Sequence, residues 1–328
     1  MKKAGRKWKH LLRSSSEAMK YVGLQSQIWR NNTSSIILLI MFPLVLYGLS
    51  WIFMFFTIQE EETYSLDAAN RGFVHFFPWI TFGVGLWFLI AYFSHSSMIM
   101  KATGSKPLER KENMRVYNLV ENLCIAAGMK MPKVNIIEDE SLNAFASGIN
   151  ERTYTVSLSR GIIDKLDDRE LEGVIAHELT HIRNRDVRLL IVSIIFVGIF
   201  AFLSEMFFRT MLYGGSSSRK GKGGIALVVG LVLALVGYLI TLLFRFALSR
   251  KREYMADAGG VELTKDPLAL ASALRKVSQD ARIEAVKRQD VAQMFIENPL
   301  EKKGSVSFSQ LFATHPPIDE RIRLLEQF

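Results

Sequence analysis

The sequence predicts an α-rich integral membrane protein with about four transmembrane helices and an α+β domain outside the membrane. Three observations lead to this class. Hydrophobic residues make up 49% of the chain, which is at the upper edge of the range for soluble proteins. They are concentrated in four long runs. The polar segments between and after the runs show the periodicities of short helices and strands.

The four apolar runs lie at residues 36–58, 73–100, 189–208 and 225–244, and Glu205 is the one charged residue within them. Each run reaches the roughly 20 residues that a helix needs to cross a hydrocarbon core of about 30 Å. A buried helix of a large soluble protein is the alternative. The first run is too long for the apolar part of a signal peptide and follows a long polar stretch, so we interpret it as a retained anchor.

These runs divide the chain into five segments. Residues 1–34 form a basic N-terminal extension, and residues 35–100 form a first transmembrane hairpin. Residues 101–186 are the first part of the soluble domain, and residues 187–248 form a second hairpin. Residues 249–328 complete the soluble domain.

The distribution of charge predicts the topology. Many of the basic residues behind the net charge of +9 precede the first run or follow the second, whereas the loop between these runs is acidic. Basic flanks mark the cytoplasmic side, so we expect the N-terminus and the soluble domain in the cytoplasm. Binding to nucleic acid would also use basic charge, but the sequence has neither a base-stacking platform nor a reading helix.

Two basic segments leave alternatives open. Residues 8–29 suit either a helix lying on the membrane surface or a disordered tail. The connector of the second hairpin, residues 213–224, is basic where the topology expects the non-cytoplasmic side. Either the charge rule is broken locally, or this hairpin is tilted, re-entrant or only partly inserted.

The soluble segments predict both helices and strands. Residues 115–128 have helical periodicity and end at a glycine, and residues 133–137 are typical of a short strand. Residues 143–148 and 153–157 predict a strand pair. A capping box formed by Asp167 and Glu170 predicts the start of the next helix.

That helix carries the pattern HELTH, which predicts a metal site. His177 and His181 are four residues apart, so both imidazoles lie on one helix face and can bind one ion. Glu178 lies beside them, and at this spacing a glutamate acts as the general base that activates water. The pattern is that of a zincin-type α+β catalytic domain. Asn184 and Asp186 are expected to shape the junction with the third run.

A catalytic zinc site needs a third protein ligand and an open position. Glu253 and Asp257 are also four residues apart, so Glu253 can complete a His₂Glu site for one Zn²⁺ per chain. Asp257 can accept the far N–H of a ligand histidine and fix its tautomer. A two-pass hairpin between His181 and Glu253 returns the chain to the same side of the membrane. Other divalent ions could also fit these ligands.

Five motifs together resemble the HtpX-like membrane metalloproteases, relatives of the CAAX prenyl endopeptidases: HELTHIRNRD (177–186), SRKREYMAD (249–257), NAFASG (143–148), FIENPL (295–300) and FATHPP (312–317). The resemblance covers about residues 73–328. It implies an ATP-independent zinc endopeptidase of the inner membrane that hydrolyses misfolded or damaged membrane proteins under stress. It also implies that Asn143, Ala144 and Phe145 lie on the strand that pairs with extended substrate. The basic extension is longer than this family leads us to expect.

Two further residues are candidates for auxiliary roles. His315 is held by two prolines and could approach the metal as a temporary fourth ligand or as a donor to the oxyanion. A helix-capping or core histidine is the alternative. Arg321 could pair with a buried acid near the site, or it could be an ordinary surface arginine.

Two other functions compete with membrane proteolysis. A prenyl-protein endopeptidase uses the same zinc chemistry, but such enzymes enclose a chamber with more membrane helices. A catalytically silent, zinc-stabilised membrane adaptor needs no base between the histidines, so Glu178 argues against it. The expected partners are unfolded or membrane-protein substrates and the lipid bilayer.

Overall fold

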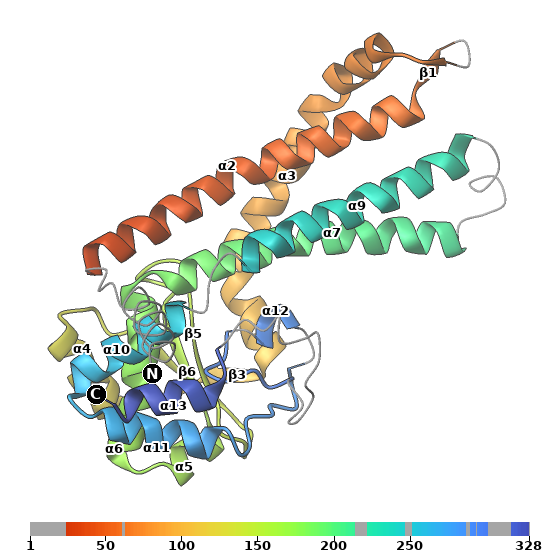
Figure 1. Ribbon diagram of the computed structural model, residues 1–328. Coiled ribbons are helices and arrows are strands. Elements are labelled where there is room, and N and C mark those ends of the chain that lie inside the picture. Colours follow the sequence, from red (N-terminus) through yellow and green to blue (C-terminus); the bar gives the residue numbers. More distant parts are fainter. Residues whose placement is uncertain are drawn as a thin grey trace, which may run out of the picture.

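We describe the fold from a computed structural model of the chain, shown in Figure 1. The structure describes the following residues: 24–60, 63–213, 222–246, 251–286, 289–292, 294–300 and 316–327. Most of the basic N-terminal extension, the centre of the basic connector and His315 lie outside the described residues. The expectations for these segments remain predictions.

Four long helices extend away from the soluble domain (Figure 1). They are α2 (Leu24–Thr57), α3 (Leu66–Thr103), α7 (Asp186–Tyr213) and α9 (Lys222–Phe246). In the described part of the chain, three helices are long and apolar enough to cross a membrane, whereas the apolar part of α9, Gly224–Ile240, is shorter. Each helix contains one of the four apolar runs, and the number of full crossings stays a prediction.

The first two long helices form a hairpin closed by two very short strands, β1 (Gln59–Glu60) and β2 (Thr63–Tyr64), which pair antiparallel. Near the middle of α2, Phe42 stacks on Phe196 of α7 with ring centroids 4.1 Å apart. Aromatic stacking of this kind joins the two hairpins along their apolar faces.

Helix α3 carries the chain from the apolar layer into the soluble domain. Its 38 residues span roughly 57 Å, which is longer than a hydrocarbon core of about 30 Å. The helix ends at Gly104, whose φ of 69° is left-handed, a conformation that glycine adopts without strain. The chain enters the sheet with the next residue.

The soluble domain is built on a four-stranded sheet with the order β3-β4-β6-β5. The strands are β3 (Ser105–Pro107), β4 (Lys133–Ile137), β5 (Ala144–Ser147) and β6 (Thr155–Ser159). β4 and β6 are parallel, and the other pairs are antiparallel. The expected strand at 133–137 and the expected strand pair are confirmed. The sequence did not predict β3, because its three residues include Pro107 and lack an alternating pattern.

The other described helices complete the soluble domain. They are α4 (Met114–Ala127), α5 (Arg160–Lys165), α6 (Asp168–Arg183), α10 (Lys251–Thr264), α11 (Pro267–Val277), α12 (Gln289–Ala292) and α13 (Ile318–Leu325). The predicted capping box of Asp167 and Glu170 is confirmed at the start of α6. Helix α10 lies close against α6. The approach is so close that a Cβ at Gly259 of α10 would come within 2.4 Å of the Thr180 side chain of α6. This approach brings Glu253 to the histidines of α6.

Candidate metal centre

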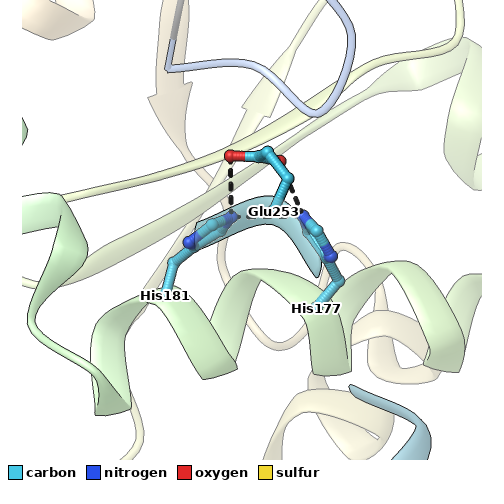
Figure 2. A group of neighbouring side chains, drawn as sticks. All are labelled: His177, His181 and Glu253. Atoms are coloured by element: carbon cyan, nitrogen blue, oxygen red, sulfur yellow. Dashed lines mark hydrogen bonds and ion pairs between the residues drawn. The ribbon is translucent and has the colours of Figure 1, made fainter. Parts of the chain in front are cut away.

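The two histidines of α6 and Glu253 of α10 converge, as Figure 2 shows. The Nε2 atoms of His177 and His181 are 3.2 Å apart. The carboxylate of Glu253 lies across them, with Oε2 3.6 Å from Nε2 of His177 and Oε1 3.7 Å from Nε2 of His181. One ligand atom from each residue lies within 4.8 Å of the others. Within the described ranges, no other group of His, Cys, Asp and Glu side chains converges in this way.

These distances fit a tetrahedral metal ion. Bonds of about 2.0–2.2 Å at a tetrahedral angle separate two donor atoms by roughly 3.3–3.6 Å. The measured separations of 3.2, 3.6 and 3.7 Å lie close to that value. Two imidazoles and one carboxylate are also a common ligand set of catalytic zinc. The residues present therefore suit zinc in both chemistry and spacing.

Glu178 lies beside the three candidate ligands, and one of its carboxylate oxygens lacks a hydrogen-bond partner within the described residues. Its side chain is buried, and its Oε2 atom receives no hydrogen bond from any residue that the structure describes. Burial raises the pKa of Glu178, although the nearby histidines oppose that effect. A buried carboxylate oxygen normally has a partner. This oxygen is therefore free to bind water or substrate.

Glu178 also lines a small pocket together with His181, Glu253 and the chain segment at Phe295 and Ile296. Its volume is about 20 Å³. A space of that size holds a water molecule. The structure therefore leaves room for water beside Glu178.

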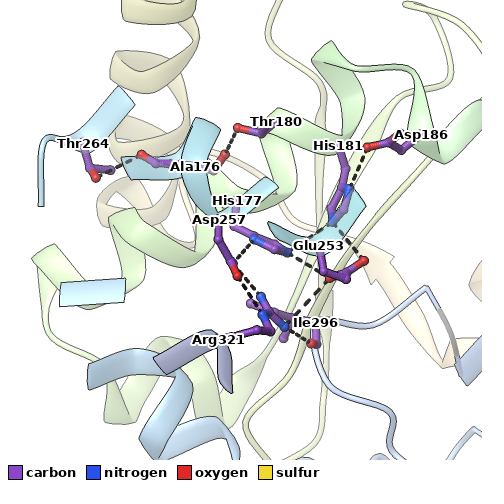
Figure 3. Close-up of polar contacts among 11 residues, drawn as sticks. Ala176, His177, Thr180, His181, Asp186, Glu253, Asp257, Thr264, Ile296 and Arg321 are labelled. Carbon is purple, nitrogen blue, oxygen red and sulfur yellow. Dashed lines mark hydrogen bonds and ion pairs between the residues drawn. The ribbon is translucent and has the colours of Figure 1, made fainter. Parts of the chain in front are cut away.

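On one side of the centre, His177 contacts a buried ion pair (Figure 3). Nδ1 of His177 lies 2.9 Å from Oδ1 of Asp257. Arg321 of α13 donates to both oxygens of Asp257, at 2.9 and 2.7 Å, and Arg321 is completely buried. Burial alone would raise the pKa of Asp257, but Arg321 and His177 hold it at about 2. The structure therefore places Asp257 and Arg321, both singled out from the sequence, beside the centre.

On the other side, His181 contacts Asp186, the first residue of α7. Nδ1 of His181 is 3.2 Å from Oδ2 of Asp186. Oδ1 of the same carboxylate accepts a hydrogen bond of 2.5 Å from the side-chain amide of Asn31 on α2. Burial alone would lower the pKa of His181, but Glu253 and Asp186 raise it to about 10. The acidic surroundings thus favour a cation at this position.

Sequence reasoning missed the contribution of Asn31. It placed Asp186 only at the membrane junction, and it assigned no role to Asn31, which it counted in the basic N-terminal extension. A polar residue at the start of an apolar run was the available signal, but such residues are ordinary at membrane surfaces.

The predicted substrate strand is covered by the chain itself. Ile296 donates its backbone N–H to the carbonyl of Ala144 at 2.9 Å, and Phe145 forms an antiparallel bridge with Phe295. The side chain of Asn143 donates to the carbonyls of Ala281 and Glu297, at 2.7 and 2.9 Å.

We call residues 294–296 the covering segment. The edge that we expect to bind substrate is thus paired, and its role in binding stays a prediction.

Comparisons with known proteins find similar peptidases. The family model described as peptidase family M48 matches residues 110–328. A "Protease HtpX homolog" of Bacteroides fragilis is 58% identical over 322 residues, covering 94% of this chain and 100% of the relative. Another from Caldanaerobacter subterraneus is 37% identical over 273 residues, covering 80% of this chain and 90% of the relative. The crystal structure of S. mikatae Ste24p, at 18% identity, has a TM-score of 0.46 and covers 91% of this chain and 66% of that one.

Proposed function

Because the chain belongs to peptidase family M48 and is a membrane metalloprotease, we propose that His177, His181 and Glu253 hold one zinc ion and that Glu178 is the general base. One observation carries the proposal. The Nε2 atoms of both histidines and the Glu253 carboxylate converge beside a buried Glu178 oxygen that has no partner among the described residues.

The two aspartates prepare the histidines for this task. Asp257 lies at Nδ1 of His177, and Asp186 lies at Nδ1 of His181. A carboxylate in that position holds the proton on Nδ1, so the lone pair of each Nε2 is directed into the centre. Bound zinc would polarise the scissile carbonyl and lower the pKa of a water ligand to about 7.

Glu178 moves the proton in hydrolysis. Its free Oε2 accepts a proton from the water molecule as the water attacks the peptide carbonyl. The same oxygen then gives the proton to the departing amine, so the carboxylate returns to its starting form. The burial of Glu178 supports this cycle, because a desolvated carboxylate is a stronger base toward water held next to it.

We infer that an extended substrate segment pairs with the edge of β5, at Asn143 to Phe145, and takes the place of the covering segment. Phe295 and Ile296 pair with that edge in the structure and also line the pocket at the centre. Backbone pairing selects unfolded or extended segments rather than a particular sequence. This fits a protease that removes misfolded or damaged membrane proteins.

The place of action follows from the same arrangement. Asp186 begins α7, so the centre lies directly at the start of a candidate membrane span. The basic flanks of the first hairpin favour a cytoplasmic soluble domain, made of residues 101–186 and 249–328, on the inner membrane. Substrates would be cut close to the bilayer surface and without ATP.

The test is cleavage of casein by the detergent-purified protein and its Glu178→Gln variant, with zinc content measured on both. Glu172→Gln is the matched control, because Glu172 lies on the same helix and outside the centre. We expect wild type and control to cleave, Glu178→Gln to lose activity, and all three to hold about one zinc per chain.

Zinc without cleavage by any of the three proteins, even with membrane-protein substrates, would favour the adaptor. Loss of zinc from the His181→Ala variant, with zinc retained by the other three proteins, would assign His181 as a ligand. Retention of zinc by His181→Ala would overturn the proposed centre.

A further inference from the structure

The first membrane helix is attached to the centre through the turn that joins α6 to α7. Asn31 of α2 donates its side-chain amide to the carbonyl of Asn184 at 2.8 Å and to Oδ1 of Asp186 at 2.5 Å. The next residue, Asn32, accepts a hydrogen bond of 3.1 Å from Arg185. Two consecutive residues of α2 thus hold three consecutive residues of the turn.

This turn has a conformation that needs outside support. Arg185 has a φ of 61°, in the left-handed region that residues with a side chain rarely adopt. The turn joins α6, which carries His181, to α7, which begins with Asp186. Its conformation therefore decides where the Asp186 carboxylate lies relative to the histidine.

The two oxygens of Asp186 have different partners. Oδ1 accepts from Asn31, and Oδ2 lies 3.2 Å from Nδ1 of His181. The amide of Asn31 fixes the plane of the carboxylate, which leaves Oδ2 directed at the imidazole. Asn31 is buried, with 4% of its surface exposed, so water does not replace this donor easily.

We propose that Asn31 is a positioning residue for the metal: it orients Asp186, which fixes the tautomer and orientation of His181. The inference rests on the proposed metal site and extends it into the transmembrane region. Asn31 is also the first residue of the candidate span Asn31–Thr57. Zinc affinity therefore depends on how the membrane helix α2 packs against the soluble domain.

A purely structural Asn31 would stabilise the turn without affecting the metal. The experiment separates the two roles by measuring zinc affinity, through competition with a chelator, and the melting temperature of the metal-free protein. Both measurements use the full-length chain in detergent. Ser35→Ala is the control, because Ser35 is a buried polar residue of the same helix whose one side-chain hydrogen bond within the described residues is to the backbone carbonyl of Asn31.

Asn31→Asp keeps the shape of the side chain but places an acceptor opposite Asp186. We expect it to weaken zinc binding about tenfold, because partners of ligand-bound groups contribute on that scale. Asn31→Leu removes both donors at similar volume and serves as a second variant should the first fail to fold. Ser35→Ala should bind zinc as the wild type does, whatever its melting temperature.

A double variant tests the route of the effect. If Asn31 acts through Asp186, then Asn31→Leu should weaken zinc binding no further in an Asp186→Asn background. Wild-type zinc affinity in both Asn31 variants, or losses that multiply in the double variant, would overturn the inference. His181→Ala provides the reference: if this variant keeps wild-type affinity, the proposed metal site itself fails.

Discussion

The two histidines of the centre are supported in the same way by two very different parts of the molecule. Each imidazole has a carboxylate at Nδ1, and each carboxylate has a nitrogen donor behind it. Behind His177 the donor is the buried guanidinium of Arg321, at the end of the soluble domain. Behind His181 it is the amide of Asn31, at the start of a membrane helix.

The two sides of the centre differ in the strength of the supporting interaction and in the part of the molecule that supplies it. The pair of Asp257 and Arg321 is buried and charged, so its partners cannot separate without a large loss of free energy. The pair of Asp186 and Asn31 is a single hydrogen bond between a charge and a neutral amide. The His177 side is therefore fixed by the soluble domain, whereas the His181 side depends on the first hairpin.

The largest effect is expected from breaking the charged pair. Arg321→Leu leaves Asp257 buried without its counter-charge, which should lower the free energy of unfolding by about 3–5 kcal/mol. Chemical denaturation of the metal-free protein in detergent measures this loss. Arg323→Leu, on the exposed face of the same helix, is the control and should change stability little. Equal stability of the two variants would mean that the buried pair does not hold α13 in place.

The next prediction compares the two carboxylates directly. Asp257→Asn and Asp186→Asn each keep the shape of the side chain while removing its charge. We expect zinc affinity to fall about 10- to 100-fold in each. The loss should be greater for Asp257→Asn, because buried Arg321 then loses the carboxylate that accepts two of its hydrogen bonds. A greater loss in Asp186→Asn would reverse the ranking of the two sides.

A carboxylate remote from both sides tests whether these zinc effects are specific. Glu170, at the other end of α6, accepts from Ser272 and Lys276, both at 2.6 Å. Burial alone would raise the pKa of Glu170, but these partners lower it below the ordinary value of 4.5. Glu170→Gln should cost about 1–2 kcal/mol of stability at neutral pH and leave zinc affinity unchanged.

The pH dependence of that loss has a definite sign. The folded-state pKa of Glu170 is lower than its unfolded value, so the charged group stabilises the protein fully above pH 4.5. The contribution disappears as the pH falls through the folded-state pKa. Unfolding curves of wild type and Glu170→Gln should therefore converge in acid. A difference that persists or grows in acid would contradict the assignment.

The smallest effect concerns the covering segment, which Arg321 also holds through the carbonyl of Ile296 at 3.0 Å. Ile296→Pro removes the N–H that bonds to Ala144, a loss of about 1 kcal/mol. We expect KM for casein to fall about fivefold with kcat unchanged. Ile296→Val keeps the N–H and should behave as the wild type. A higher KM in Ile296→Pro would indicate that the segment helps to bind substrate.

The parts that the sequence predicted are those set by local spacing. The four-residue spacing of His177 and His181 places them one turn apart on any helix. The strands β5 and β6 follow each other closely in the sequence, so their antiparallel pairing is also local. The contact of Asn31 with Asp186 joins residues 155 positions apart, and no periodicity encodes it. The covering segment was also missed, because FIENPL was recognised only as a motif and pairs with β5 through its backbone.

The membrane helices show a second limit of sequence patterns. The apolar runs of α3 and α7 look alike, yet 61% of the most apolar part of α7 is buried and none of that part of α3 is. Hydropathy shows that a helix suits apolar surroundings, but it does not show whether lipid or protein provides them. Only the packing of α7 against the other helices and the soluble domain makes the distinction.

The order of the elements along the chain also determines when the centre can assemble during synthesis. A nascent chain carries His177 and His181 well before α7, α9 and Glu253 exist, and the partner of Asp257 arrives on α13, near the C-terminus. The ligands can therefore meet only after the second hairpin has been made and folded back. The support of Asp257 by Arg321 forms only when α13 has also been made and has packed against α10.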